Sequence, residues 1–442
     1  MKIFILLLFV TFFKELVWQV VLPIWQTPDE QAHFAQLQWY AEKKTLTIDP
    51  NLNLSQEVAT SEEILGTRRD KFGNNQYTYH PEYKNTSKIP DFPKNFRTTY
   101  VDQEAAGYPP LYYLISLPFY NLFYNSGLID RLFAVRLISL IFHLGTIFIA
   151  YKIGKLPLAT LVSFHPMLSF VAAGFHPDNL LIFLYSLEIY ICLCLLKKFE
   201  FKKLFWAGLV FVLGYYTKPL MLLVAPLIVF SILPNIFGLF ALLVPILVIF
   251  SPIQIASFTS VVTPASPLAN LTFRDYLHFR LGKLFFEIWP WYWGVFKWLG
   301  VTLPPLVMKV ITRVALICSL GLIRARSKIL LFFMLSSASY LVYLLVWDYR
   351  LMQSVGFSQG LQGRYLFPNV IPHMAIFLAG WQAISKKTWW MAILPAGMII
   401  LNLIAFYTVA NSYYDLSSVH TFLIQLSQNK PGIIKILVSR LI

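Results

Sequence analysis

A short polar segment directly follows the first apolar run of the chain, and it carries the residues best suited to chemistry. Within residues 27–34, two adjacent carboxylates, Asp29 and Glu30, precede His33 by about one helical turn. A carboxylate in such a place can accept a proton from an attacking hydroxyl group. The alternative is a helix N-terminal cap, which Pro28 and the acidic residues also favour. Because a cap does not need His33, Asp29 or Glu30 is the candidate general base.

Two polar segments lie further along the chain between apolar runs. In residues 175–179, His176 and Asp178 either face a cavity, as ionisable groups at membrane depth usually do, or belong to an exposed turn. In residues 215–219, Lys218 either binds a lipid phosphate or extends its ammonium group to the membrane interface. The residues alone leave both alternatives open in each segment.

A third polar segment, residues 359–368, contains two glycines and an arginine. Gly360 and Gly363 allow the backbone to approach a ligand closely, and the forked guanidinium of Arg364 suits phosphate oxygens. Gln362 and Tyr365 flank this arginine and are candidate ligand contacts. The alternative is a glycine turn that carries an interfacial arginine.

An aromatic, proline-stiffened segment at residues 108–113 is the last candidate. Its Tyr108, Pro109 and Tyr112 either wall a groove for a long apolar lipid tail or anchor the chain at the membrane interface. The sequence does not separate these two interpretations.

The composition tells which kind of protein must position these residues. Of 442 residues, 57% are hydrophobic and 13% charged, with a mean hydropathy of +0.61, which excludes a water-soluble protein of this size. Apolar runs long enough to cross a hydrocarbon core of about 30 Å as helices recur along the chain. The sequence therefore predicts an all-α integral membrane protein.

The net charge of +15 arises mostly from short loops between apolar runs, which argues against nucleic acid as a partner. Cys192, Cys194 and Cys318 all fall inside predicted spans, so neither a disulfide framework nor a zinc cluster is expected. No cofactor or metal is assigned. A divalent cation stays open, because the carboxylates and histidines named above could approach one another in space.

Four basic loops, near residues 151–155, 197–203, 324–328 and 386–387, should be cytoplasmic by the positive-inside rule. An even number of predicted spans separates each loop from the next. The segment 108–124 is interpreted as a hairpin or interfacial helix, which places the N-terminus in the cytoplasm. About eleven spans result, at residues 3–24, 132–150, 156–174, 179–196, 203–217, 219–233, 236–254, 301–323, 328–347, 366–384 and 388–410.

Six regions follow from this topology. A first span (1–25) leads into a large extracytoplasmic loop with interfacial helices (26–131), which carries most of the acidic residues. The remaining regions are a bundle of spans (132–254), an extracytoplasmic amphipathic loop (255–300), a second bundle with a short external loop at 348–365 (301–410), and an extracytoplasmic tail (411–442).

Taken in order, the motifs around Asp29, Tyr108, His176, Lys218 and Arg364 resemble the GT-C superfamily of multi-span glycosyltransferases. The chain is most similar to the DUF2142 family of bacterial membrane proteins, related to protein mannosyltransferase-like and aminoarabinose-transferase-like enzymes. It departs from the aminoarabinose transferases, which carry a lysine just before the paired prolines, where this chain has Gly107 and Tyr108.

The resemblance implies a GT-C-type bundle in the cytoplasmic membrane, with an essential aspartate, matched by Asp29, near the start of the first external loop. It implies transfer of a sugar, with inversion, from a polyprenyl-phosphate or polyprenyl-diphosphate donor to a glycan, lipid or protein acceptor outside the membrane. Lys218, Arg364 and Tyr365 would then bind the donor phosphate. The candidate pocket residues are Tyr108, Pro109, Tyr112, His176, Asp178 and Gln362.

Two other classes of function compete with this enzyme. A transporter or flippase for a lipid-linked saccharide would also need basic groups facing a cavity, but it would favour an internal repeat, and the sequence has none. A structural membrane protein would not need Lys218 and Arg364 on the outer side.

Overall fold

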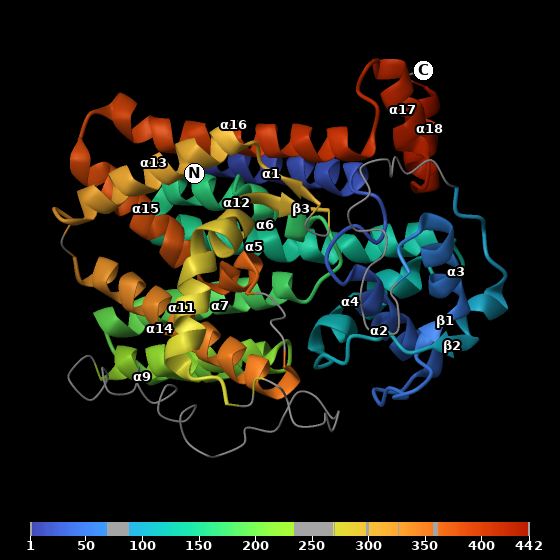
Figure 1. Cartoon of the computed structure of the whole chain (residues 1–442), viewed down its shortest axis with the longest axis horizontal. Coiled ribbons are helices and arrows are strands. Elements are labelled where there is room, and N and C mark those ends of the chain that lie inside the picture. Colours follow the sequence, from blue (N-terminus) through green and yellow to red (C-terminus); the bar gives the residue numbers. More distant parts are fainter. Residues whose placement is uncertain are drawn as a thin grey trace.

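The computed structural model describes residues 2–68, 88–233, 268, 270–297, 300–325, 327–356 and 361–440. Within them the chain forms a bundle of apolar helices with a cap of short helices at one end (Figure 1). Helices dominate because a helix satisfies its own backbone groups, which an apolar surrounding cannot do. Two sheets of two short strands are the remaining regular structure among the described residues.

Among the described residues, six helices are long and apolar enough to cross a membrane. This finding supports an all-α membrane protein with several apolar helices. The six are α1 (Lys2–Val21), α5 (Leu128–Ser163), α7 (Asp178–Lys197), α13 (Pro305–Leu322), α14 (Lys328–Val355) and α16 (Thr388–Tyr413).

Shorter helices occupy the positions of other expected spans. They are α6 (Pro166–Ala172), α8 (Phe201–Tyr215), η2 (Pro219–Val224), α9 (Ala225–Ile232), η4 (Gly363–Asn369) and α15 (Val370–Ile384). The 15 residues of α8 reach only about 22 Å, less than a hydrocarbon core. The expected span 236–254 lies outside the described residues, so the total of about eleven stays a prediction.

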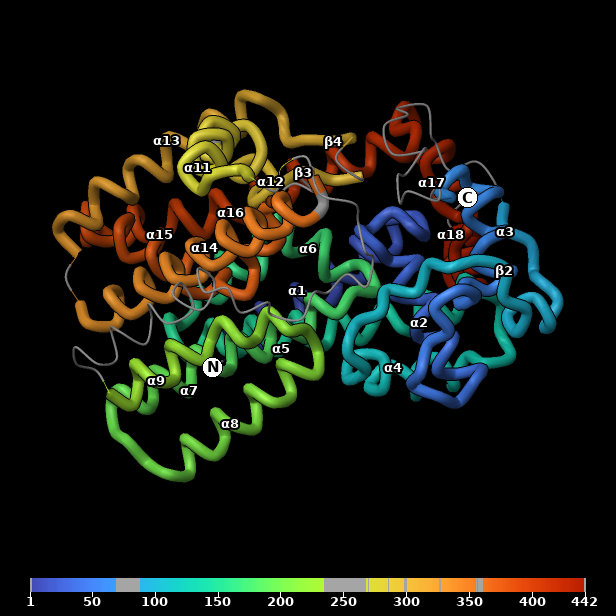
Figure 2. Tube along the Cα trace, turned by 60° about the horizontal axis from the view of Figure 1, so that its bottom comes forward, coloured from blue at the N-terminus to red at the C-terminus, as the bar shows by residue number. Residues whose placement is uncertain are grey.

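The cap is built from the first loop and lies beside the C-terminal tail (Figures 1 and 2). The tail forms α17 (Val419–Ser427) and α18 (Gly432–Ser439). In the loop, helix α4 (Leu111–Leu122) has 12 residues, too few to span a bilayer, which agrees with the expected interfacial helix. The other elements of the loop are α2 (Glu30–Lys43), β1 (Leu54–Ser55), α3 (Gln56–Leu65), η1 (Lys94–Arg97) and β2 (Tyr100–Asp102), with β1 and β2 antiparallel.

The two ends of the bundle differ in their connections. Figure 1 shows the α7–α8 and α15–α16 connections toward the left, whereas the cap and the C-terminus lie at the right. The backbone amide of Leu111 in the cap donates to the carbonyl of Tyr216, which places the α8–η2 connection at the cap end. The basic connections near 197–203 and 386–387 thus lie at the end of the bundle opposite to the first loop, an arrangement that fits the positive-inside rule.

Helix α5 reverses direction at Gly154 and Lys155, whose backbone angles are not helical. The ring of Phe4 on α1 stacks on Tyr151 at 3.8 Å, and the hydroxyl of Thr11 lies 2.7 Å from that of Ser163. The second half of α5 therefore lies along α1 and runs in the same direction as α1. This hairpin corresponds to the two expected spans 132–150 and 156–174, although the second is broken at His165 between α5 and α6.

Polar side chains satisfy the backbone carbonyls that this break releases. The Lys14 ammonium group donates to the carbonyl of Ser163, and the Asn402 amide donates to the carbonyl of Phe164 at 3.2 Å. The indole of Trp18 donates to Asn402 Oδ1 at 3.2 Å. A broken helix is tolerated at membrane depth where neighbouring groups take over its hydrogen bonds. The hydrogen bonds at the break consequently link α1, α5, α6 and α16.

The second half of the chain departs from the expected boundaries at two places. Helix α13 begins at Pro305 rather than 301, because β4 (Val301–Thr302) pairs with β3 (Val295–Phe296). Helix α14 continues to Val355, so the expected external loop at 348–365 begins too early. The helix continues past Asp348, whose carboxylate is buried in an ion pair.

The partner of Asp348 comes from the amphipathic segment expected at 273–289. This segment forms α11 (Phe273–Lys283) and the π-helical turn η3 (Leu284–Ile288), followed by α12 (Trp289–Gly294). Arg280 Nε lies 2.6 Å and the Tyr276 hydroxyl 2.7 Å from Asp348 Oδ2, and both side chains are buried. Helix α11 is therefore fixed to α14 through its polar residues.

Replacing Asn402 by leucine should destabilise the bundle. The substitution leaves the Phe164 carbonyl and the Trp18 indole without partners, and each buried unpaired group costs about 1–3 kcal/mol. We expect a lower thermal denaturation temperature of the detergent-purified protein. Asn411→Leu, at an exposed position of the same helix, is the control and should have little effect.

Candidate functional site

Six of the candidate residues gather where the cap meets the bundle. They come from the start of α2, the α6–α7 connection, the first residue of α7, the residue before η2, and η4, and their charges act on one another. They are Asp29, His33, His176, Asp178, Lys218 and Arg364. Residues from four separate segments of the chain thus form one cluster.

Asp29 forms an ion pair with Arg364. The guanidinium Nη2 lies 2.9 Å from Asp29 Oδ2, and the two side chains are 33% and 6% exposed, respectively, for Asp29 and Arg364. Asp29 occupies the N-cap position of α2 with a left-handed backbone (φ 58°), but its side chain makes no capping hydrogen bond. The segment thus starts a helix, as the cap interpretation expected, but the Asp29 carboxylate bonds Arg364 instead of capping the helix, and Arg364 is buried.

Two glycines allow close packing near Arg364 and near Asp29. A side chain at Gly363 would collide with the backbone of Tyr292 on α12, and one at Gly174 would collide with Thr27. Gly363 therefore serves contact with α12, whereas the sequence suggested contact with a ligand. Gly360 lies outside the described residues.

Lys218 and Asp178 form a second, buried ion pair. Lys218 Nζ lies 2.7 Å from Asp178 Oδ1, and both side chains are almost completely buried. Burial disfavours the charge on Lys218, but the carboxylate of Asp178 outweighs burial and raises the lysine pKa. The exposed-turn and membrane-interface alternatives are thus wrong for Asp178 and Lys218. The two pairs together carry one positive charge for each negative charge.

His33 and His176 lie between the two ion pairs. Their rings meet edge to face at 4.3 Å between centroids, and His33 Nδ1 lies 2.8 Å from the hydroxyl of Tyr113. Burial lowers the pKa of His33 well below its ordinary value and that of His176 to about 4. Both imidazoles are therefore neutral near neutral pH.

Tyr108 closes one side of the cluster. Its ring lies 4.9 Å from Lys218 Nζ and 5.5 Å from the ring of His33. Gln36, one turn beyond His33 on α2, bonds both the carbonyl and the amide of Tyr108 at 2.7 and 3.1 Å. The residue where aminoarabinose transferases carry lysine thus does contact the cluster, but as an aromatic ring.

Glu30 has a structural environment that distinguishes it from its neighbour Asp29. Its two oxygens accept hydrogen bonds from Arg136 at 2.8 and 2.7 Å and from the backbone amides of Trp25 and Phe175 at 3.0 Å. Both charged side chains are fully buried. Because its acceptor sites are occupied, Glu30 is unsuited to act as a base. Sequence analysis missed Arg136, although an arginine inside an apolar run is itself a signal.

The remaining candidates have weaker connections to the cluster. Tyr112 is buried and its hydroxyl lies 2.8 Å from that of Ser139, so it packs α4 on α5 and cannot wall a lipid groove. Tyr365 follows Arg364, whose guanidinium lies 5.5 Å from its ring. Pro109 and Gln362 are partly buried next to Tyr108 and Arg364.

The cluster offers carboxylates and histidines, but they are engaged with other groups. Among the described residues, no three cysteine, histidine, aspartate or glutamate side chains lie close enough together to hold a metal ion. Asp178, for example, is bound to Lys218.

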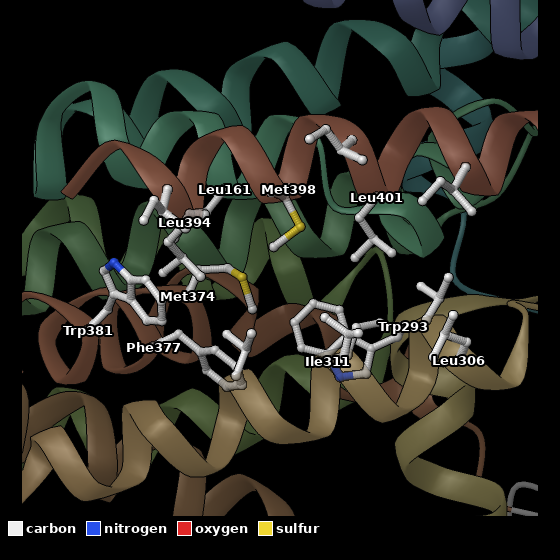
Figure 3. A pocket seen from close by; sticks show the side chains of 17 residues that line it. Leu161, Trp293, Leu306, Ile311, Met374, Phe377, Trp381, Leu394, Met398 and Leu401 are labelled. Atoms are coloured by element: carbon white, nitrogen blue, oxygen red, sulfur yellow. The ribbon is translucent and has the colours of Figure 1, made fainter. Parts of the chain in front are cut away.

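An apolar groove runs between α13, α15 and α16 (Figure 3). Its volume is about 390 Å³, and its walls include Ile311, Met374 and Met398. Trp293 of α12 also lines it, and the neighbouring Tyr292 contacts Gly363, the residue before Arg364. Helix α12 therefore contributes to both the groove and the support of Arg364.

Comparison with known proteins gives one match. A family model described as "Predicted membrane protein (DUF2142)" matches residues 12–372, a range that contains every candidate site residue. Neither the curated proteins nor the solved structures contain a match.

The adjacent carboxylates should respond differently to the loss of charge. Glu30→Gln leaves the buried Arg136 without its counter-charge, and breaking such a pair costs about 3–5 kcal/mol. Asp29→Asn should cost much less, because Asp29 is partly exposed and Arg364 also lies near Asp178. Thermal denaturation of both purified variants measures the difference. Equal stability of the two would contradict the structural role of Glu30.

Proposed function

The chain belongs to the DUF2142 family of predicted membrane proteins, and from this premise we propose that it is a GT-C-type membrane glycosyltransferase. It moves a sugar from a polyprenyl-phosphate-type donor to an acceptor hydroxyl outside the membrane, with Asp29 as the general base. The observation that carries this proposal is the Asp29–Arg364 pair, which sets a partly exposed carboxylate beside a buried cation.

The reaction requires a base and an anion site close together. Asp29 accepts the proton of the acceptor hydroxyl while its oxygen attacks the anomeric carbon. The bond from that carbon to the phosphate oxygen breaks, and the lipid phosphate leaves with the electron pair. A single in-line displacement of this kind inverts the anomeric carbon and needs no protein nucleophile.

Arg364 stabilises the negative charge that grows on the leaving phosphate. Its Nε is buried and lacks a hydrogen-bond partner, so the guanidinium retains a donor for a phosphate oxygen. Lys218 belongs to the same cluster, but its ammonium group is bound to the buried Asp178. We therefore assign the larger part of phosphate stabilisation to Arg364.

The prenyl chain of the donor would occupy the apolar groove of Figure 3. The groove is lined almost entirely by apolar side chains, and α12 connects it to the support of Arg364. An extended chain of isoprene units can fill such a groove through dispersion and burial of its methyl groups.

The proposal also assigns the site to one side of the membrane. By the positive-inside rule the N-terminus and the basic loops face the cytoplasm, and the cluster at the cap end faces the outside. The acceptor is then a glycan, lipid or protein of the cell envelope.

Replacing the base should abolish transfer. With a panel of radiolabelled polyprenyl-phosphate sugars, membranes containing Asp29→Asn should transfer or hydrolyse donor about 10²- to 10⁴-fold more slowly than the wild type, because the amide cannot accept the proton. Asparagine retains the shape of the side chain and tolerates the left-handed backbone of this position.

The amounts of both proteins in the membranes must be equal for this comparison. If the wild type is active and the variant equals it, Asp29 is not the base. If neither transfers sugar but both move a lipid-linked saccharide between leaflets, the transporter interpretation replaces this one.

Filling the groove should weaken binding of long-chain donors. Gly397 lines the groove and has open space around its Cβ position, so Gly397→Phe directs a ring into the groove. We expect a higher KM for a long prenyl chain and an unchanged KM for a short one. Gly208→Phe on α8, where the space is equally open, is the matched control. Equal effects of the two substitutions would exclude the groove as the donor site.

A further inference from the structure

His33 presents a buried nitrogen without a partner. Its Nε2 makes no hydrogen bond, although the residue is fully buried and Nδ1 is bonded to Tyr113. Buried polar atoms in native proteins nearly always have partners, so an unpaired one next to a candidate catalytic carboxylate points to a missing ligand.

The partner of Nδ1 identifies the proton on this ring. Burial raises the pKa of the Tyr113 phenol, so its hydroxyl keeps a proton, and His33 Nδ1 is its hydrogen-bond partner among the described residues. If Tyr113 donates to Nδ1, only Nε2–H remains unpaired; the opposite tautomer would leave both the phenol proton and Nε2 unpaired. The favoured neutral imidazole thus carries its proton on Nε2.

His176 has the same tautomer for an independent reason. Its Nδ1 accepts a hydrogen bond from the backbone amide of Asp178 at 3.0 Å, so the proton of the neutral ring lies on Nε2. The contact of 3.4 Å between Nδ1 and Asp178 Oδ2 is then no ion pair. The two rings add two N–H donors to the cluster without adding charge.

We propose that His33 and His176 bind a phosphate oxygen of the lipid-linked donor through their Nε2–H groups, as neutral hydrogen-bond donors beside Arg364. The proposal deepens the proposed function and rests on it. It gives His33 a ligand-binding role in place of a share in proton transfer.

The hydrogen-bonding groups of the cluster indicate the type of ligand. The histidine Nε2–H groups, Arg364 Nε and Lys218 Nζ are all donors, and they match phosphate oxygens, which only accept. A sugar hydroxyl would bring a proton that needs an acceptor. Asp29 is one such acceptor, one helical turn before His33, so an acceptor hydroxyl at Asp29 and a phosphate at the rings are neighbours.

The groups around the rings keep both imidazoles neutral. Lys218 and Arg364 oppose a further positive charge, whereas Asp29 and Asp178 favour it, and burial decides the balance. The charged and titratable groups that face the rings are Asp29, Asp178, Lys218, Arg364, Tyr108 and Tyr113. A neutral ring binds an anion without lowering the basicity of Asp29 as a second cation would.

Binding of a prenyl phosphodiester to the full-length protein in nanodiscs tests this proposal. The probe is farnesyl methyl phosphate, which lacks the second ionisation of a phosphate monoester near pH 6. His33→Leu should bind it roughly 10- to 100-fold more weakly, the value of one hydrogen bond to a charged group. His33→Gln, whose amide nitrogen reaches the position of Nε2, should retain most of the affinity.

The pH dependence of binding by the wild type is a second test, and it needs no variant. Neutral donors predict a constant affinity from about pH 5.5 to 8, whereas imidazolium donors with ordinary pKa values would lose affinity as the pH rises through about 6.5. Such a loss, or equal affinities of the leucine variant and the wild type, would overturn the proposal.

If the wild type transfers sugar while His33→Leu changes only kcat and not binding, His33 acts in proton transfer instead. Failure of the wild type to bind any prenyl phosphate would overturn the proposed function itself.

Discussion

The buried ion pair of Arg136 and Glu30 is the interaction on which the arrangement of the cluster depends. Besides Glu30, Arg136 donates to the backbone carbonyls of Gln19, Leu22 and Pro23, which end α1. Glu30 in turn accepts the amide of Phe175, just before His176. The end of α1, the start of α2, α5 and the α6–α7 connection therefore share one fixed point. Since a buried charge requires its partner, these segments cannot separate independently.

The candidate cluster could largely be predicted from sequence, but the pairing within it could not. Asp29, His176, Lys218 and Arg364 were recognisable because polar residues between apolar runs are conspicuous. The order of residues along the chain does not reveal that Arg364 contacts Asp29 across more than three hundred residues. Nor does it reveal that Asp178 balances the charge of Lys218. The same limit explains why Glu30 looked like a rival base, since its partner Arg136 lies in the middle of an apolar run.

The fold was predictable where hydrophobicity alone determines it. The helices α1, α7 and α16 begin and end within a few residues of the expected spans. Prediction was wrong where a polar residue has a tertiary partner: the span expected to end at residue 347 continues, because Arg280 pairs with Asp348 inside α14. The break at His165 was also missed, because the groups that satisfy it, Lys14 and Asn402, come from helices remote in sequence.

The contact between α1 and α16 has a consequence for the order of assembly in the cell. The ribosome makes α1 long before α16, yet Trp18 bonds Asn402, 384 residues later, and the hydroxyls of Tyr413 and Tyr414 bond Gln26 and the carbonyl of Val21. Because a chain is synthesised from its N-terminus, these groups cannot meet their partners before α16 has been made. The contact between α1 and α16 therefore forms late in assembly.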